Sequence, residues 1–359
     1  MQATRYQAED EAVAAEELFE SGWTDGLPVV VPTPERVGMM LATGGLDPDA
    51  VLGTVGPLNG TATVEKVAVN AVMAGCQPDW FPVVIAAVRA VSRPEFDIGE
   101  IQSTTHGLGP VVVVNGPARE ICGGIASGWG ALGAGHRPNV TIGRALRLVL
   151  MNIGGGRPGV TDMALHGQPG KIACCFAEAE EDSPFAPLHT TFGFAAEDSA
   201  VVVAGVESPH SVVASPNRGD PEAAERLVRV IGRSIANAGS NNTYFGTGNV
   251  LVVLNPDHAQ LLADFGYTRE SLRARVCEEA VTPRETLESF APLNPVRGEE
   301  PLVRAIRDER NLLIAVAGGT GVYSQVMNSW GGGTYGNVAV AQEIEIGQAC
   351  ELPGTGYAP

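Results

Sequence analysis

Short apolar runs alternate with helically spaced apolar stripes along the chain, which predicts an α/β protein. Uninterrupted runs at 111–114, 200–205 and 312–316 are typical of strands covered on both faces. Strands that alternate with helices indicate largely parallel sheets. Further strands are expected at 29–31, around 172–176 and from 249, and helices at 8–20, from Pro34, at 63–74, from Pro78, at 141–152, 221–238, from Pro256 and at 268–279.

One architectural unit occurs twice in this pattern. An apolar strand followed by a Pro-initiated helix and a Gly break occurs at 30–41 and again at 253–262. A strand followed by a Gly turn, small residues and Trp-Gly occurs at 111–130 and again at 313–331. The repeated order predicts an internal duplication, although strand–Pro–helix is also common in unrelated α/β proteins. The expected division is a helix at 1–22, a first α/β half at 23–198 and a second at 199–359.

Length and charge narrow the class of protein. A chain of 359 residues exceeds the usual size of a single core, so two cores are expected. The net charge of −18 would repel phosphate backbones and anionic lipid, so neither nucleic acid nor a membrane surface is an expected partner. The acidic N-terminus does not resemble a secretory signal, and no apolar run is long enough to span a bilayer. We therefore expect a cytoplasmic protein with reduced cysteines and leave a homo-oligomer open.

Two glycine motifs imitate nucleotide sites without the required context. The string at 154–159 has the GxGxxG spacing, but it follows a predicted helix and Pro158 interrupts the helix that would receive a pyrophosphate. The string ending in Gly170-Lys171 has Ile172 where a phosphate loop needs Ser or Thr. No dinucleotide or Walker-type nucleotide is therefore expected; the cofactor is unknown, and a divalent metal remains open.

Cysteines are the strongest chemical candidates. Cys76 lies between two predicted helices, just before Pro78 starts the second, where unpaired N–H groups would lower its pKa. A thiolate nucleophile or acid/base thiol is one interpretation, and a small buried residue at a helix junction is the other. Cys174 and Cys175 must face opposite sides of a strand. With Lys171 and Glu178 nearby, one of these thiols could belong to the same site, or the segment is an ordinary core strand.

Histidines in Gly/Pro-rich loops support an alternative. His106 and His166 each precede a glycine and could lie at sheet ends, where α/β proteins bind ligands. The alternative metal set is His106, His136, His166 and Glu178, although no two of these have a local ligand spacing. His166 is also a candidate acid/base residue.

The two Trp-Gly loops would meet if the halves were related by a pseudo-twofold axis. A cleft between similar halves is a favoured small-molecule site. The expected substrate-binding residues at this cleft are Asn115, Gly124, Ser127, Gly319, Ser324 and Asn328. The other interpretation is that Trp129 and Trp330 each plug a core edge.

Four strings resemble those of an uncharacterised bacterial protein family. They are TDGLPVV at 24–30, AGCxP at 74–78, TIGRA at 141–145 and VLNPDHA at 253–259. The resemblance spans most of the chain but implies no activity.

These observations predict an enzyme that acts on a small polar metabolite between two α/β halves through cysteine thiolate chemistry. The catalytic candidates are Cys76, Lys171, Cys174, Cys175, Glu178 and His166, with N–H groups of the glycine loops at 123–130 and 318–321 stabilising negative charge. The alternatives are a metal-dependent hydrolase or lyase that uses the loop histidines, and a noncatalytic small-molecule-binding or assembly subunit.

Overall fold

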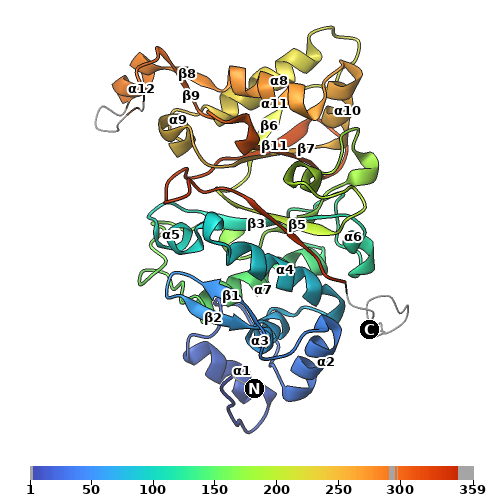
Figure 1. The fold of residues 1–359 in the computed structure, drawn as a ribbon, viewed down its shortest axis with the longest axis vertical. Helices are drawn as coiled ribbons and strands as arrows, with labels where there is room; N and C mark the ends of the chain where they lie inside the picture. Colours follow the sequence, from blue (N-terminus) through green and yellow to red (C-terminus); the bar gives the residue numbers. More distant parts are fainter. Residues whose placement is uncertain (1–2, 291–295, 297, 347–359) are drawn as a thin grey trace.

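Two four-stranded mixed sheets stack face to face at the centre of the α/β fold, with helices outside each, as Figure 1 shows. The computed structural model describes residues 3–290, 296 and 298–346. The first sheet has the order β12-β5-β3-β4 and the second the order β10-β7-β11-β6. The strands are β3 (Gly109–Asn115), β4 (Cys175–Ala177), β5 (Ala200–Val206), β6 (His210–Val213), β7 (Val250–Leu254), β10 (Leu312–Val316), β11 (Tyr323–Met327) and β12 (Val340–Glu343).

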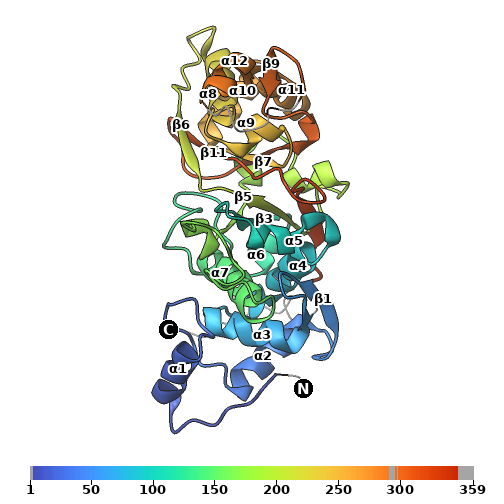
Figure 2. The same ribbon diagram turned by 90° about the vertical axis from the view of Figure 1, so that its left-hand side faces the viewer.

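Helices cover the two outer faces, so the molecule is long in the direction in which its layers stack (Figure 2). Outside the first sheet lie α3 (Val64–Ala74), α4 (Phe81–Val91) and α7 (Arg137–Asn152), with α1 (Glu11–Glu20) and α2 (Pro34–Gly44) beyond them. Outside the second lie α8 (Ala223–Ile235), α10 (Pro256–Asp264) and α11 (Arg269–Glu279). Smaller elements are the antiparallel pairs β1 (Val51–Val55) with β2 (Gly60–Thr63) and β8 (Val281–Pro283) with β9 (Leu302–Arg304), and the helices α5 (Ile98–Ser103), α6 (Ala118–Ile121), α9 (Asn241–Phe245) and α12 (Arg284–Phe290).

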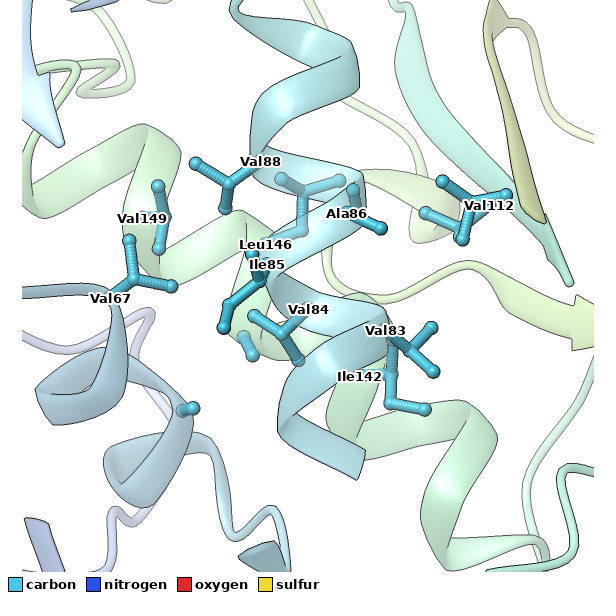
Figure 3. Close-up of a cluster of buried hydrophobic side chains, with 14 of the residues drawn as sticks. Val67, Val83, Val84, Ile85, Ala86, Val88, Val112, Ile142, Leu146 and Val149 are labelled. Atoms are coloured by element: carbon cyan, nitrogen blue, oxygen red, sulfur yellow. The ribbon is translucent and has the colours of Figure 1, made fainter. Parts of the chain in front are cut away.

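Side-chain alternation along β3 connects two of the cores. Val111 and Val113 pack between the sheets, against residues such as Leu251 of the second sheet. Val112 and Val114 point the other way, into the core formed with α3, α4 and α7. Figure 3 shows part of this core with α3, α4 and α7, in which Val112 of β3 belongs to the same cluster as residues of α4 and α7. Because both faces of the strand are covered, its apolar run is continuous, as the sequence predicts.

Most predicted elements are confirmed, often to within a few residues. Strands 111–114, 200–205 and 312–316 correspond to β3, β5 and β10. The helix expected at 63–74 is α3, which Thr63 caps by accepting a hydrogen bond from the Lys66 amide and Gly75 ends at φ +88°. The strand expected at 29–31 is wrong: these residues form no strand, and the segment leads into α2 on the outside of α3.

The expectation of largely parallel sheets is also wrong. Each main sheet has one parallel pair, β3–β4 or β7–β10, and two antiparallel pairs. After β4 the chain passes through short 3-10 helices. It then starts β5 opposite Asn115, at the same end of the sheet at which β4 terminates. A strand that starts at the end of the sheet where the preceding strand terminated must run in the opposite direction. Antiparallel pairing of β5 with β3 follows.

The two main sheets have the same order and the same strand directions. The series β4-β3-β5-β12 corresponds to β10-β7-β11-β6, with a parallel pair followed by two antiparallel pairs in each. The edge strands are exchanged: β6 follows β5 but lies in the second sheet, and β12 follows β11 but lies in the first. The predicted boundary at 198 assigns β5 to the second half, whereas β5 pairs with β3 in the first sheet.

None of the helices in the described ranges combines the length and apolarity needed to cross a membrane.

Close approach of α7 to the segment that enters β4 predicts a sensitive glycine. A Cβ at Gly143 would lie 2.5 Å from the backbone nitrogen of Cys174, so Gly143→Ala should destabilise the protein by about 2 kcal/mol through overpacking. Gly38→Ala is the control, because this exposed position within α2 has open space around it and alanine favours helix by about 0.7 kcal/mol. Urea unfolding of both variants measures the difference, and equal stabilities would contradict the close packing.

Candidate functional site

Helix α7 positions most of the polar groups that the first half buries. Its first turn holds Thr141 beside Cys76, and two turns later Arg147 reaches a second buried cluster. Between them, Arg144 donates two hydrogen bonds of 2.8 Å to Asp25, which fixes the turn before α2. The helix is amphipathic, and nearly all of its residues from 142 to 151 are buried. Polar side chains on this helix are therefore held in a largely dry environment.

The fold brings Cys76 and the Cys174–Cys175 pair into one neighbourhood. Cys76 and Cys174 both lie close enough to Cys175 to disfavour its charged form. Cys76 contacts the first turn of α7 through a hydrogen bond with Thr141, and Arg137 of the same turn donates to the Gly75 carbonyl. The three thiols therefore lie near one another, and whether they form a site stays a prediction.

Burial opposes the predicted thiolate form of Cys76. It raises the pKa of Cys76 to about 12, against smaller lowering effects from Thr141, Arg137 and Arg144. Desolvation also raises the pKa of Cys174 to about 12 and that of Cys175 well above its ordinary value. The helix end is present, as the sequence indicates, but loss of water outweighs it. Cys76 packs within the first hydrophobic core, which is the alternative interpretation given above.

A second cluster beside these cysteines contains three buried charges. Lys171 Nζ lies 2.8 Å from Asp162 Oδ1, and Arg147 donates to Asp162 Oδ2 at 3.2 Å. Arg147 also donates to the side-chain oxygen of Gln102 at 2.9 Å. Each of these four side chains is at least nine-tenths buried. The cluster thus holds two cations against one anion.

Lys171 stands out by residue type. The chain has 23 basic residues, of which only Lys66 and Lys171 are lysines, and Lys171 is the buried one. Desolvation lowers the pKa of the Lys171 amine, Asp162 opposes this shift, and the neighbouring Arg147 lowers the pKa further. Of the predicted catalytic residues, Lys171 therefore has the most favourable surroundings for chemistry at neutral pH.

Sequence reasoning missed most of this cluster. Arg147 follows from the helical pattern only as a polar position, and Gln102 carries no signal that singles it out. The scarcity of lysine was the one usable signal, because a lysine retained among 21 arginines has a chemistry that arginine lacks.

Glu178 accepts hydrogen bonds from both sheets. None of its hydrogen bonds is to a cysteine among the described residues, contrary to its predicted role beside the thiols. Its carboxylate accepts hydrogen bonds from Asn115 Nδ2 and Leu188 N, both at 2.6 Å, and from Val316 N at 3.3 Å. Arg269 lies 3.6 Å away. Burial raises the pKa of Glu178. Since both oxygens already accept bonds inside the protein, Glu178 and Asn115 form a structural junction.

The two glycine loops do meet, as predicted. Gly318 N donates to the Ser127 carbonyl at 2.7 Å, and the Trp129 ring covers the open side of Gly319. Trp129 is 74% exposed and does not plug a core, whereas Trp330 packs partly against the first core. Gly124 has open space beside it in the same loop. The loops make contact and leave no substrate cleft between Ser127 and Gly318.

The remaining predicted binding residues lie elsewhere. Ser324 bonds to His258 Nδ1 at 2.7 Å inside the second half, and Asn328 donates to Ser240 Oγ at 2.9 Å beyond the opposite end of β11. An open groove of about 350 Å³ does run between the halves near Gly321, whose amide donates to Asp257. Its lining, Glu181–Pro184 with Arg218, Pro256, Asp257 and Gln260, includes none of the predicted residues.

The predicted histidine set does not converge on a metal site. His106 pairs with Glu207 at 2.9 Å, His136 bonds to the Trp129 carbonyl at 2.8 Å, and His166 is exposed on its loop. Glu178 is engaged at the sheet junction. Across the part of the chain that the structure describes, no three His, Cys, Asp or Glu residues are arranged to hold a metal ion.

Comparison with protein-family models and with curated proteins finds no match for this chain. Its function is therefore argued from its own geometry.

The raised thiol pKa values predict unreactive cysteines. In the native protein at pH 8, iodoacetamide should alkylate Cys76 and Cys175 at least about 100-fold more slowly than in urea-unfolded protein, because thiolate is scarce and access is poor. The partly exposed Cys174 should react first. Peptide mass spectrometry measures each rate, and rapid native labelling of Cys76 would restore the thiolate hypothesis.

The junction predicts that Glu178→Gln destabilises the protein by about 3 kcal/mol. The new amide N–H would face buried N–H donors that now point at a carboxylate. Glu11→Gln is the control, because the exposed Glu11–Arg36 pair should contribute less than about 1 kcal/mol. Urea unfolding measures both, and a small effect at position 178 would show that the sheets do not depend on this carboxylate.

Proposed function

We propose that this chain is a cytoplasmic enzyme that acts on a small polar metabolite, with Lys171 as the reactive group. The observation that carries the proposal is the buried Lys171 amine, which shares the carboxylate of Asp162 with Arg147 at the wall of a small cavity. A buried lysine whose pKa is lowered by desolvation beside a specific charge partner is the arrangement expected of a functional site.

The neighbours of Lys171 suit a neutral amine. Burial and the positive charge of Arg147 both lower the pKa of its ammonium, so a larger fraction carries a free lone pair at neutral pH. A free amine can accept a proton from the substrate or attack a carbonyl carbon. Asp162, at 2.8 Å, orients the amine and can hold it in place while the proton moves.

The cysteines do not line the cavity, but the Cys174 backbone packs behind part of its wall. Lys171 precedes Cys174 by three residues, and Gly143, which lines the cavity, packs against the Cys174 backbone. The apolar part of the cavity lining comes from Pro110, Leu146 and Leu150. A dry wall keeps water from the amine and preserves its lowered pKa.

We also propose that the two halves arose by internal duplication. The matching strand order and directions of the main sheets support this origin. The equivalent strands would be β3 with β7 and β4 with β10. The sequence pattern instead aligns the 111–130 segment of β3 with the 313–331 segment of β10.

Amine acylation across pH tests the assignment, with Lys66 as the control within the same molecule. Lys66 is only half-buried and donates to the Thr61 carbonyl, so it serves as the accessible reference amine. Lys171 should reach its plateau rate at lower pH. In Asp162→Asn its plateau should move to lower pH still, because the carboxylate that favours the ammonium is gone.

Acetic anhydride pulses with peptide mass spectrometry give both profiles, because the chain has only these two lysines. A Lys171 profile that plateaus at or above the pH of the Lys66 profile would contradict the proposed function.

A further inference from the structure

The cavity beside Lys171 is small and partly enclosed, with a volume of about 10 Å³, room for a single water-sized group. Its polar lining consists mainly of Gln102, Arg147 and Lys171, and its apolar lining includes Pro110, Leu146 and Leu150. Pro110 has no N–H group and so adds no backbone donor. The polar chemistry of the cavity is therefore set by three side chains.

These side chains leave a donor without an acceptor. Gln102 is fully buried, and its Oε1 accepts a hydrogen bond from Arg147. Its amide nitrogen Nε2 has no hydrogen-bond partner among the residues that the structure describes. A buried N–H group left unpaired costs about 1–3 kcal/mol, so an acceptor from outside the chain would be stabilised here.

The charge balance points the same way. Lys171 and Arg147 share the single carboxylate of Asp162, which leaves one positive charge uncompensated when both are protonated. A single anionic oxygen can accept hydrogen bonds from both a guanidinium and a primary amide. The small volume excludes a tetrahedral phosphate from full entry.

We infer that this cavity binds the carboxylate group of a small metabolite, through Arg147 and the free amide N–H of Gln102. The inference rests on the proposed function for the identity of that metabolite as the substrate of Lys171. One carboxylate oxygen occupies the cavity, and the remainder of the molecule extends toward its opening. The anchored group then lies beside the amine.

Calorimetric titration of the full chain with sodium formate and sodium acetate tests the binding directly. Chloride and phosphate at equal ionic strength are the comparison anions. We expect formate and acetate to bind at least about tenfold more tightly than chloride, a difference of about 1.4 kcal/mol, with no tighter binding of phosphate. Equal weak binding of all four anions, or no binding, would overturn the inference.

Gln102→Glu is the sharpest variant, because it keeps the shape and replaces the free N–H donor by an oxygen that carries the missing negative charge. It should fold, retain or raise the melting temperature, and weaken formate binding at least about tenfold. Gln260→Glu makes the same change in net charge on the exposed face of α10 and should leave formate binding unchanged. Formate binding that survives Gln102→Glu would overturn the assignment of Gln102.

Acylation of Lys171 in the presence of formate separates this inference from the proposed function. A bound carboxylate favours the ammonium and should slow acylation of Lys171, relative to Lys66, at least about threefold. Formate binding together with an ordinary Lys171 profile supports the carboxylate site and removes the catalytic role of the amine. A shifted Lys171 profile without formate binding supports the amine and overturns the carboxylate site.

Discussion

One buried carboxylate, that of Glu178, accepts hydrogen bonds from both halves of this molecule, beside the apolar layer that packs between the sheets. The parallel strands of the first sheet end at Asn115 and Ala177, and those of the second end at Leu254 and Val316. Glu178 accepts hydrogen bonds from groups on both sides of this junction. In α/β proteins the carboxyl ends of parallel strands commonly form the ligand site. Here groups at the two sets of ends bond to the same carboxylate, so both oxygens of Glu178 are engaged within the protein.

The candidate reactive side chains therefore lie in the helical layer and not at the ends of the strands. Helix α7 crosses the outer face of the first sheet and holds both the cysteine neighbourhood and the Lys171 cluster. Burial acts on both in the same sense, because it favours the neutral form of every group. For a thiol the neutral form is the unreactive one, whereas for an amine it is the nucleophile and base. The same dry surroundings therefore argue against Cys76 and in favour of Lys171.

Much of the fold could be predicted from local pattern, because apolar periodicity and caps act over a few residues. The run at 312–316 predicts β10 to the residue, and Thr63 and Gly75 mark the ends of α3. Strand direction could not be predicted in this way. Whether β5 runs parallel or antiparallel to β3 depends on where the chain re-enters the sheet, which no local pattern encodes. The exchanged edge strands β6 and β12 are hidden for the same reason.

The site was only half accessible to sequence reasoning, since desolvation depends on tertiary packing. Cys76 at a helix junction suggests a lowered pKa from the nearest charges and dipoles, but the sign of the net shift is set by the residues that exclude water. Lys171 is the opposite case. Its local motif only resembles a phosphate loop that lacks the required Ser or Thr, and its surroundings are set by Arg147 and Asp162, which lie further away in the sequence. Gln102 is the extreme case, because its unpaired amide N–H can be recognised only when all neighbouring atoms in the fold are known. A buried donor without an acceptor, more than any motif, is thus the feature on which the proposed ligand site depends.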